Sequence, residues 1–205
     1  MKKFEHVKSV AVPWLLPNID TDVITPMKRI LYNMEEMGKY SFAPYRFADG
    51  DGDNEALNPM FPLNQPQYRD SKIMLVGENF GCGSSRETAA IAIAEIGIQC
   101  LIAPSFGGIF FKNCFQQGIL PIVLPVETIH HLASLQGELE INLENCQIAC
   151  PDGKRIPFET EASCRRMLLD GLDDVMLTLR KETRTREFIK KDSVLRPWVY
   201  RNVLI

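Results

Sequence analysis

The chain has 205 residues, of which 45% are hydrophobic, so it carries enough apolar side chains for a sizeable buried core and is not expected to be disordered. Its 26 acidic and 23 basic residues give a formal net charge of -3, and the Lys and Arg residues are spread along the sequence, which argues against a nucleic-acid partner. Charged residues interrupt the N-terminal stretch before a signal peptide can form, and no window approaches the roughly 18 to 20 apolar residues of a membrane span, so we expect a cytoplasmic protein without a membrane partner.

The first third of the sequence predicts one strand followed by loops. Residues 7–15 are apolar enough for a strand, and the Asn, Asp and Pro content of residues 18–26 marks a loop. A short helix is expected near residues 31–40. Residues 44–69 are polar and proline-rich, and we expect them to form a long connection rather than a domain linker.

The middle of the sequence alternates between two kinds of segment. Short apolar runs at residues 72–77, 100–105 and 119–125 alternate with segments of helix-forming composition at residues 85–97 and 107–118. Strands that alternate with helices imply right-handed crossovers. This pattern predicts an α/β fold with a largely parallel central sheet flanked by helices.

The last third predicts both strands and helices. The Arg and Lys residues of its final helix are more typical of a solvated helix face than of a binding patch. We expect a single domain over residues 1–205, with a C-terminal helical extension at about 161–205. The expected elements are a helix at 126–137, strands at 138–150 and 154–159 that pair through a Pro-Asp-Gly turn, and helices at 161–172 and 173–191.

The most informative segment is GCGSSRE, residues 81–87, which lies between a predicted strand and a predicted helix. Open α/β sheets place ligands at this end of a parallel strand, and Gly81 and Gly83, on either side of Cys82, allow backbone amides to approach a ligand. Arg86 adds a planar guanidinium, which can donate two parallel hydrogen bonds to a carboxylate. The segment lacks the Gly-Lys-Ser/Thr end of a phosphate-binding loop, so a small carboxylic acid fits better than a phosphate.

A structural explanation of the same segment stays open at this point. Ser84 and Glu87 have the spacing of a capping box, in which the serine caps a helix and the glutamate bonds back to the cap. A serine in that position needs no catalytic role.

A second candidate binding segment lies in the loop at residues 18–26 and just beyond it. Asp20, Thr21 and Asp22 are typical of turns that bond to their own backbone, which explains such a triplet without any ligand. Lys28 and Arg29 follow closely and would supply positive charge to a second carboxylate if this loop faces the first.

Metal binding by this chain alone is not expected. The six cysteines have irregular spacings without a C-x-x-C pair, and only three histidines are available, so neither zinc ligands nor iron–sulfur ligands are recognisable. The acidic stretch at residues 49–55 departs from the calcium loop of an EF-hand. We therefore expect no metal site here and no cofactor bound by this chain; a metal that takes part in the reaction would come from another chain.

Five segments, in this order and at these distances, carry a resemblance to a known family. The chain resembles the small subunits of 3-isopropylmalate dehydratase, in the aconitase superfamily, over roughly residues 5–190. GCGSSRE is the most specific of the five. The segments are NIDTDVITP, LNQPQY, ENFGCGSSRE, SFGGIFFKNCFQQGILPI and GLDDVMLTL.

The resemblance implies a swivelling β/β/α domain that closes over a large subunit. That partner is implied to carry a [4Fe-4S] cluster, whose iron acts as a Lewis acid on the departing hydroxyl. The family reaction converts 2-isopropylmalate into 3-isopropylmalate, both small dicarboxylates, by dehydration and rehydration through an alkene.

The resemblance also implies roles for individual residues. Ser84 matches the base that removes the proton on carbon, and Arg86 matches an arginine that binds a substrate carboxylate. The other residues that it places at the substrate or in the anion-binding loop are Ser85, Asp22, Thr21, Arg29, Lys28, Gly81, Cys82 and Gly83.

Two positions depart from the family pattern. Thr88 stands where many relatives have histidine, and Gly108 stands where aspartate is common. They keep two alternatives open: a paralogue for another 2-substituted malate, citraconate or a homoaconitate-type substrate, or a carboxylate-binding domain without catalysis.

Overall fold

The structure is a computed structural model that describes residues 3–32 and 36–200. The chain separates into two compact units, Met1–Gly171 and Leu172–Ile205, called unit 1 and unit 2 below. The single domain over residues 1–205 stays a prediction. Unit 1 contains all the predicted site residues.

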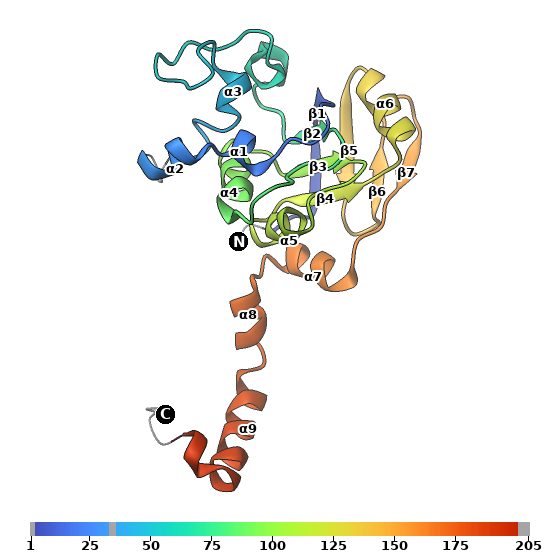
Figure 1. Cartoon of the computed structure of the whole chain (residues 1–205). Coiled ribbons are helices and arrows are strands. Elements are labelled where there is room, and N and C mark those ends of the chain that lie inside the picture. The colour runs from blue at the N-terminus through green and yellow to red at the C-terminus, as the bar shows by residue number, and fades with distance from the viewer. Residues whose placement is uncertain (1–2, 33–35, 201–205) are drawn as a thin grey trace. The chain divides into compact units, whose positions relative to one another are not determined.

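Unit 1 is built on a seven-stranded sheet with the strand order β4-β3-β2-β1-β5-β6-β7 (Figure 1). Strands β1 to β4 pair in parallel, and β1, β5, β6 and β7 pair antiparallel. The strands are β1 (His6–Trp14), β2 (Ile73–Val76), β3 (Cys100–Ala103), β4 (Leu120–Val123), β5 (Glu138–Asn142), β6 (Gln147–Ala149) and β7 (Arg155–Pro157).

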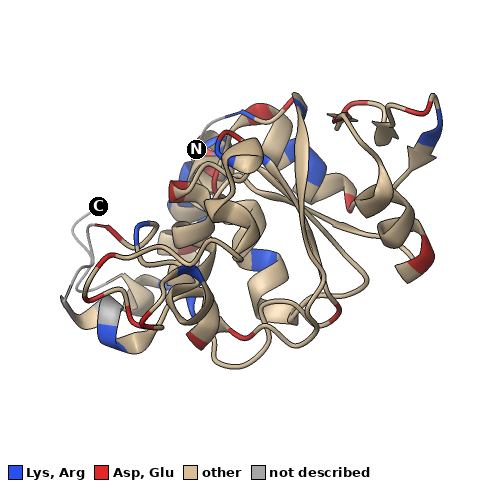
Figure 2. Ribbon diagram, turned by 90° about the horizontal axis from the view of Figure 1, so that it is seen from above, with Lys and Arg blue, Asp and Glu red and all other residues tan. Residues whose placement is uncertain are grey.

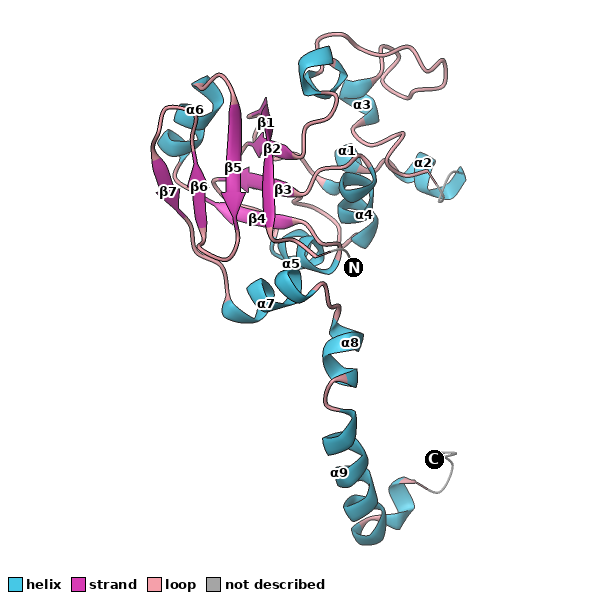
Figure 3. Ribbon diagram, turned by 180° about the vertical axis from the view of Figure 1, so that it is seen from behind, coloured by secondary structure: helices cyan, strands magenta, loops and turns pink. Residues whose placement is uncertain are grey.

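Helices cover both faces of the parallel strands. Figures 1 and 3 show α4 and α5 on one side and α6 on the other, as right-handed crossovers require for α4 and α5. The helices of unit 1 are α1 (Thr21–Ile24), α2 (Met27–Tyr32), α3 (Ala43–Arg46), α4 (Glu87–Glu95), α5 (Gly108–Gln116), α6 (Val126–Ser134) and α7 (Ala162–Asp170), with the 3₁₀ turns η1 (Pro62–Asn64) and η2 (Pro66–Tyr68).

Burial on both faces explains why β2 and β3 are continuous apolar runs, because strands covered on both sides have no polar face to present. Met74 and Leu101 belong to the same buried cluster as Ala89 and Ile93 of α4 and Phe110 of α5. This packing fixes the strand ends, and therefore the loops that leave them.

The α/β class is confirmed, but one predicted strand is wrong. Residues 138–150 form a hairpin of β5 and β6, because the Asn142 side chain accepts a hydrogen bond from the Asn145 amide at 2.9 Å and Cys146 adopts a φ of 51°. The hairpin of β6 and β7 across the Pro-Asp-Gly turn is confirmed.

Unit 2 consists of α8 (Asp174–Leu179), α9 (Glu182–Leu195) and the turn η3 (Pro197–Val199). The single helix predicted for residues 173–191 is therefore wrong, because the chain breaks between α8 and α9. Arg196 and Tyr200 both donate hydrogen bonds to the Asp192 carboxylate, which fastens η3 to the end of α9.

Charges are distributed as the sequence predicts. Lys and Arg are interspersed with Asp and Glu along the ribbon (Figure 2). Within the described part of the chain, no helix has the length and apolarity to cross a bilayer.

Candidate functional site

The loops that leave β1, β2 and β3 lie side by side beyond the carboxyl edge of the parallel strands. The Asn18 amide donates to the Glu78 carbonyl at 2.8 Å, and the Gly81 amide donates to the Ile19 carbonyl at 2.7 Å. On the other side, the Gly107 amide donates to the Phe80 carbonyl at 2.8 Å. Bridges between Asp20 and Cys82 and between Phe80 and Phe106 continue the parallel register. We call these three connected segments the strand-end loops.

Two glycines make this close approach possible. Gly81 has a φ of 72°, and a Cβ built there overlaps the ring of Phe110. A Cβ built on Gly107 overlaps the Gly81 carbonyl. Only glycine fits where one backbone presses on a ring or on another backbone. The packing of the loops therefore requires glycine at residues 81 and 107.

The aspartate turn joins this structure directly. The Asp20 side chain caps α1 by accepting from the Val23 amide at 2.8 Å. Thr21, whose side chain is buried, bonds to the glycine loop twice: its amide donates to the Cys82 carbonyl at 2.9 Å, and its hydroxyl donates to the Ser84 carbonyl at 3.1 Å. The two segments that the sequence singles out are thus bonded to each other.

The capping box predicted at residues 84–87 is wrong. Helix α4 begins at Glu87, its N-cap is Arg86, and no side chain caps it. Glu87 instead accepts a hydrogen bond from the Gln117 side chain at 2.9 Å. Ser84 and Ser85 are exposed. The Ser84 hydroxyl makes no hydrogen bond with the described residues, so it is available to a ligand.

Arg86 lies between the glycine loop and α1. Its side chain is only 14% exposed, and its Nη1 donates to Asp22 Oδ1 at 2.5 Å and to the Thr25 carbonyl at 3.3 Å. Asp22 is 57% exposed. The structure therefore brings Ser84, Arg86, Thr21 and Asp22 into one site. Thr25 was missed at the sequence level because only its carbonyl takes part, and a carbonyl leaves no residue-type signal.

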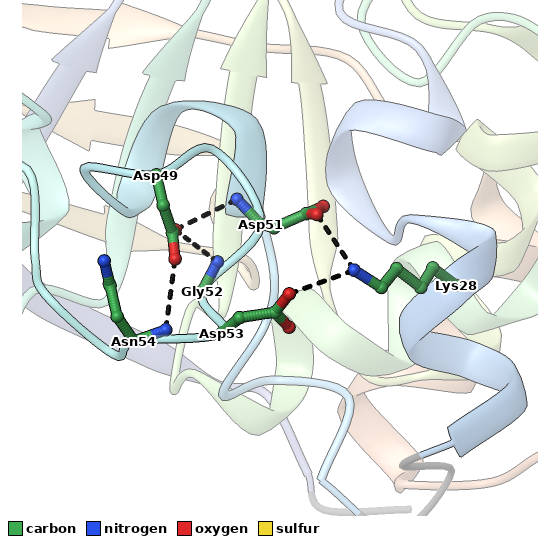
Figure 4. Close-up of polar contacts among 6 residues, drawn as sticks. All are labelled: Lys28, Asp49, Asp51, Gly52, Asp53 and Asn54. Atoms are coloured by element: carbon green, nitrogen blue, oxygen red, sulfur yellow. Dashed lines mark hydrogen bonds and ion pairs between the residues drawn. The ribbon is translucent and has the colours of Figure 1, made fainter.

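Lys28 points to a different partner. Its ammonium donates to Asp51 at 2.9 Å and to Asp53 at 3.1 Å, and these hydrogen bonds raise the pKa of Lys28 (Figure 4). The Asp49 carboxylate orders the same loop by accepting from three backbone amides. The side chain of Arg29 lies outside the described residues.

The cysteines differ in environment. Cys82 is half-buried in the glycine loop, whereas burial raises the pKa of the Cys100 and Cys114 thiols. No three His, Cys, Asp or Glu side chains within residues 3–32 and 36–200 are arranged to hold a metal ion.

The two departures from the family pattern have different surroundings. The Thr88 hydroxyl is buried and has no hydrogen-bond partner in the part of the chain that is described. Gly108 faces open space, since a Cβ built there meets nothing within 4 Å.

Comparisons with known proteins agree with one another. The family model described as the aconitase C-terminal domain matches residues 1–127. The chain is 46% identical to the 3-isopropylmalate dehydratase small subunit of Dinoroseobacter shibae, over 97% of this chain and 100% of the relative. It is 44% identical to that of Ruegeria pomeroyi, with the same coverage.

A solved structure shares the fold. The crystal structure of 3-isopropylmalate dehydratase (leuD) from Methanocaldococcus jannaschii matches with a TM-score of 0.64 and 28% sequence identity. The match covers 89% of this chain and 99% of that chain.

Proposed function

The chain belongs to the family of 3-isopropylmalate dehydratase small subunits, and on that premise we propose that it is the subunit of a hydro-lyase that isomerises 2-isopropylmalate to 3-isopropylmalate in leucine biosynthesis. The observation that carries the proposal is that one glycine loop carries both an exposed Ser84 hydroxyl and, two residues later, the largely buried Arg86 guanidinium. The site is open to solvent on this chain, and we propose that a large subunit completes it. A cytoplasmic location stays a prediction.

We propose that Ser84 is the base of the dehydration step. The reaction removes a proton from one carbon and hydroxide from its neighbour, which leaves an alkene, and water then adds with the opposite regiochemistry. An ordinary hydroxyl is a poor proton acceptor at neutral pH. The loop amides and the Arg86 charge lower the cost of negative charge at Ser84, most strongly once a partner has excluded water.

We propose that Arg86 binds one carboxylate of the substrate. A guanidinium matches a carboxylate with two parallel hydrogen bonds, and the low exposure of this side chain reduces competition from water. Ser85 and the backbone of Cys82 and Gly83 complete the proposed anion-binding loop, whereas the Gly81 amide already donates to the Ile19 carbonyl and shapes the loop through its conformation. Lys28 would reach a second carboxylate only after leaving Asp51 and Asp53.

We assign the [4Fe-4S] cluster to the large subunit, as the family resemblance implies. Cys100 and Cys114 do not fit the role of cluster ligands because they are buried in the core, and no three His, Cys, Asp or Glu side chains of the described residues are grouped to hold a metal ion. The steps proposed for this chain are therefore proton removal and carboxylate binding.

The test is to co-express the chain with its large subunit, reconstitute the complex without oxygen and follow the alkene absorbance with 2-isopropylmalate. Ser84→Ala should lower kcat by about 100-fold or more while KM stays within about threefold, because the hydroxyl acts only in the chemical step. Ser163→Ala, on α7, is the matched control.

Two results would count against the proposal. Near-normal turnover by Ser84→Ala would remove the serine from its role as base. A wild-type complex that is inactive on 2-isopropylmalate but dehydrates another 2-substituted malate would reassign the substrate.

A further inference from the structure

An uncharged groove of about 510 Å³ lies at the carboxyl end of β1. It is lined by the end of β1, by α3 and by the segment that leads into η1. Trp14 in its wall is only 6% exposed and packs edge-to-face on Tyr45 and on Phe61, each at a centroid distance of 5.2 Å. We call this hollow the aromatic groove.

The aromatic groove is held in shape by a side chain that lines it. Asn58 donates to the Tyr45 carbonyl at 2.9 Å and accepts from the Met60 amide at 3.0 Å. The two outer walls are thus bonded to each other. A groove that is already formed needs little ordering when it binds a partner, and this lowers the free-energy cost of association.

Apolar side chains are exposed around the aromatic groove. Met60 is 80% exposed, Leu16 42% and Tyr45 39%. Single exposed apolar residues are ordinary, but several of them around one uncharged hollow are typical of a protein contact.

Two hydrogen-bond donors in the wall are left without a partner. The indole N–H of Trp14 and the hydroxyl of Tyr45 make no hydrogen bond with the residues that the structure describes. Such groups usually find a partner when they are buried. Aromatic-lined grooves bind extended peptide segments, whose apolar side chains fill the groove and whose carbonyls can accept from such donors.

The aromatic groove continues the surface of the strand-end loops. A Cβ built on Gly77, just beyond β2, overlaps the carbonyl of Leu16. Two residues after Leu16, the Asn18 amide donates to the Glu78 carbonyl at 2.8 Å. Leu16 is therefore fixed against the loop that leads from β2 to Ser84, and the groove lies on the same edge of the sheet as the candidate site.

We propose that the aromatic groove receives an extended, uncharged and apolar segment of the large subunit. The Trp14 and Tyr45 donors bond to main-chain carbonyls of that segment, and Met60 and Leu16 pack on its side chains. This inference rests on the proposed function, because it takes the large subunit as the protein that completes the site. A second copy of this chain bound at the same edge would compete with that subunit.

The first experiment measures the dissociation constant between the chain and its reconstituted large subunit by isothermal titration calorimetry. Met60→Glu and Leu16→Glu should each raise Kd at least about tenfold, because each places a charge against an apolar segment. Met60→Leu keeps an apolar side chain and should stay within about twofold of the wild type. Val194→Glu is the matched control, since Val194 of α9 is 79% exposed and lies in unit 2.

Three results would overturn the inference. Kd values of both groove variants within about twofold of the wild type would show that the groove binds nothing of the large subunit. Equal weakening by Val194→Glu would remove the effect from the groove. A wild-type chain that dimerises alone, with a dimer that Met60→Glu breaks, would assign the groove to a second copy.

The second experiment uses the wild-type chain and does not depend on how a variant folds. Hydrogen exchange of the amides of residues 14–16 and 58–61 should slow at least about fivefold when the large subunit is added, because the partner covers them. Unchanged exchange in a complex that has formed would contradict the proposal. Slower exchange in a complex that is inactive on 2-isopropylmalate would keep the docking surface and reject the proposed substrate.

Discussion

At the scale of single residues, the position of the glycine loop depends on contact between Gly81 and the ring of Phe110. Phe110 of α5 lies against Gly81, and its ring also packs edge-to-face on Phe80 at a centroid distance of 5.6 Å. The ring is buried and belongs to the main core cluster. The position of the glycine loop is therefore set by core packing as well as by its own backbone.

Gly81→Ala should destabilise unit 1 by about 2 to 4 kcal/mol, because it combines a strained positive φ with overlap against Phe110. Gly97→Ala is the control: its φ is also positive, at 88°, but its Cβ meets nothing within 4 Å, so only about 1 kcal/mol is expected. The measurement is the free energy of unfolding in urea. Equal losses in the two variants would show that Phe110 does not press on the loop.

The sequence identifies several residues of the candidate site but not the contacts between them. Ser84 and Arg86 stand in one short segment with a recognisable composition. The bond between Arg86 and Asp22 joins residues 64 positions apart, and no spacing rule predicts it. The capping box at Ser84 was mispredicted for the same reason, because a distant hydroxyl, Thr21, occupies the Ser84 carbonyl and the helix begins later.

At the scale of elements, the loop at residues 49–55 is ordered by one carboxylate. Asp49 accepts from the amides of Gly52 at 2.6 Å, Asn54 at 3.1 Å and Asp51 at 3.1 Å, and the first of these contributes most to lowering the pKa of Asp49 (Figure 4). The loop presents Asp51 and Asp53 to Lys28 of α2. An ordered loop therefore holds the Lys28 side chain of α2, the helix that follows α1.

A carboxylate whose pKa is lower in the folded state stabilises the fold at pH values above its unfolded pKa. That contribution is lost as the pH falls through the folded pKa. For Asp49, whose ordinary value is 3.8, we expect the Gly52 and Asn54 amide resonances to titrate with a midpoint below 3.8. Asp49→Asn should abolish the titration. A midpoint at or above 3.8 would contradict the amide bonds.

The strands were predicted more accurately than the turns between them. Continuous apolar runs identify β2 and β3 because both of their faces are buried, and β4 because its first three residues are buried. The break between β5 and β6 depends on the side chain of Asn142 bonding to the backbone, which competes with the strand pattern without changing it. The break between α8 and α9 likewise falls inside an uninterrupted helix-forming composition.

At the scale of the whole molecule, the boundary between units falls after α7 rather than before it. Met167 and Leu168 of α7 are buried in unit 1, and the Phe4 amide donates to the Leu168 carbonyl at 3.0 Å. Gly171, with a φ of 67°, ends the helix. The helical extension predicted from residue 161 therefore contains one helix that belongs to the core of unit 1.

A chain that ends after Gly171 should unfold in one cooperative transition within about 5 °C of the same transition in the full chain, because it keeps the sheet and every helix of unit 1. A chain that ends after Glu161 lacks α7 and should melt at least about 8 °C lower, since it exposes the partners of Leu168. Circular dichroism during heating measures both. Similar melting of the two chains would place α7 outside the core.

The hydrogen bonds between the strand-end loops limit how the specificity of this protein can change. Each of the three segments constrains the path of its neighbours, so insertions or altered backbones there disturb the others at the same time. Variation is tolerated most readily where a side chain can be added without moving the main chain, and Gly108 is such a place because a Cβ built there meets nothing within 4 Å. A change of specificity is therefore expected to come from substituted side chains on an unchanged backbone.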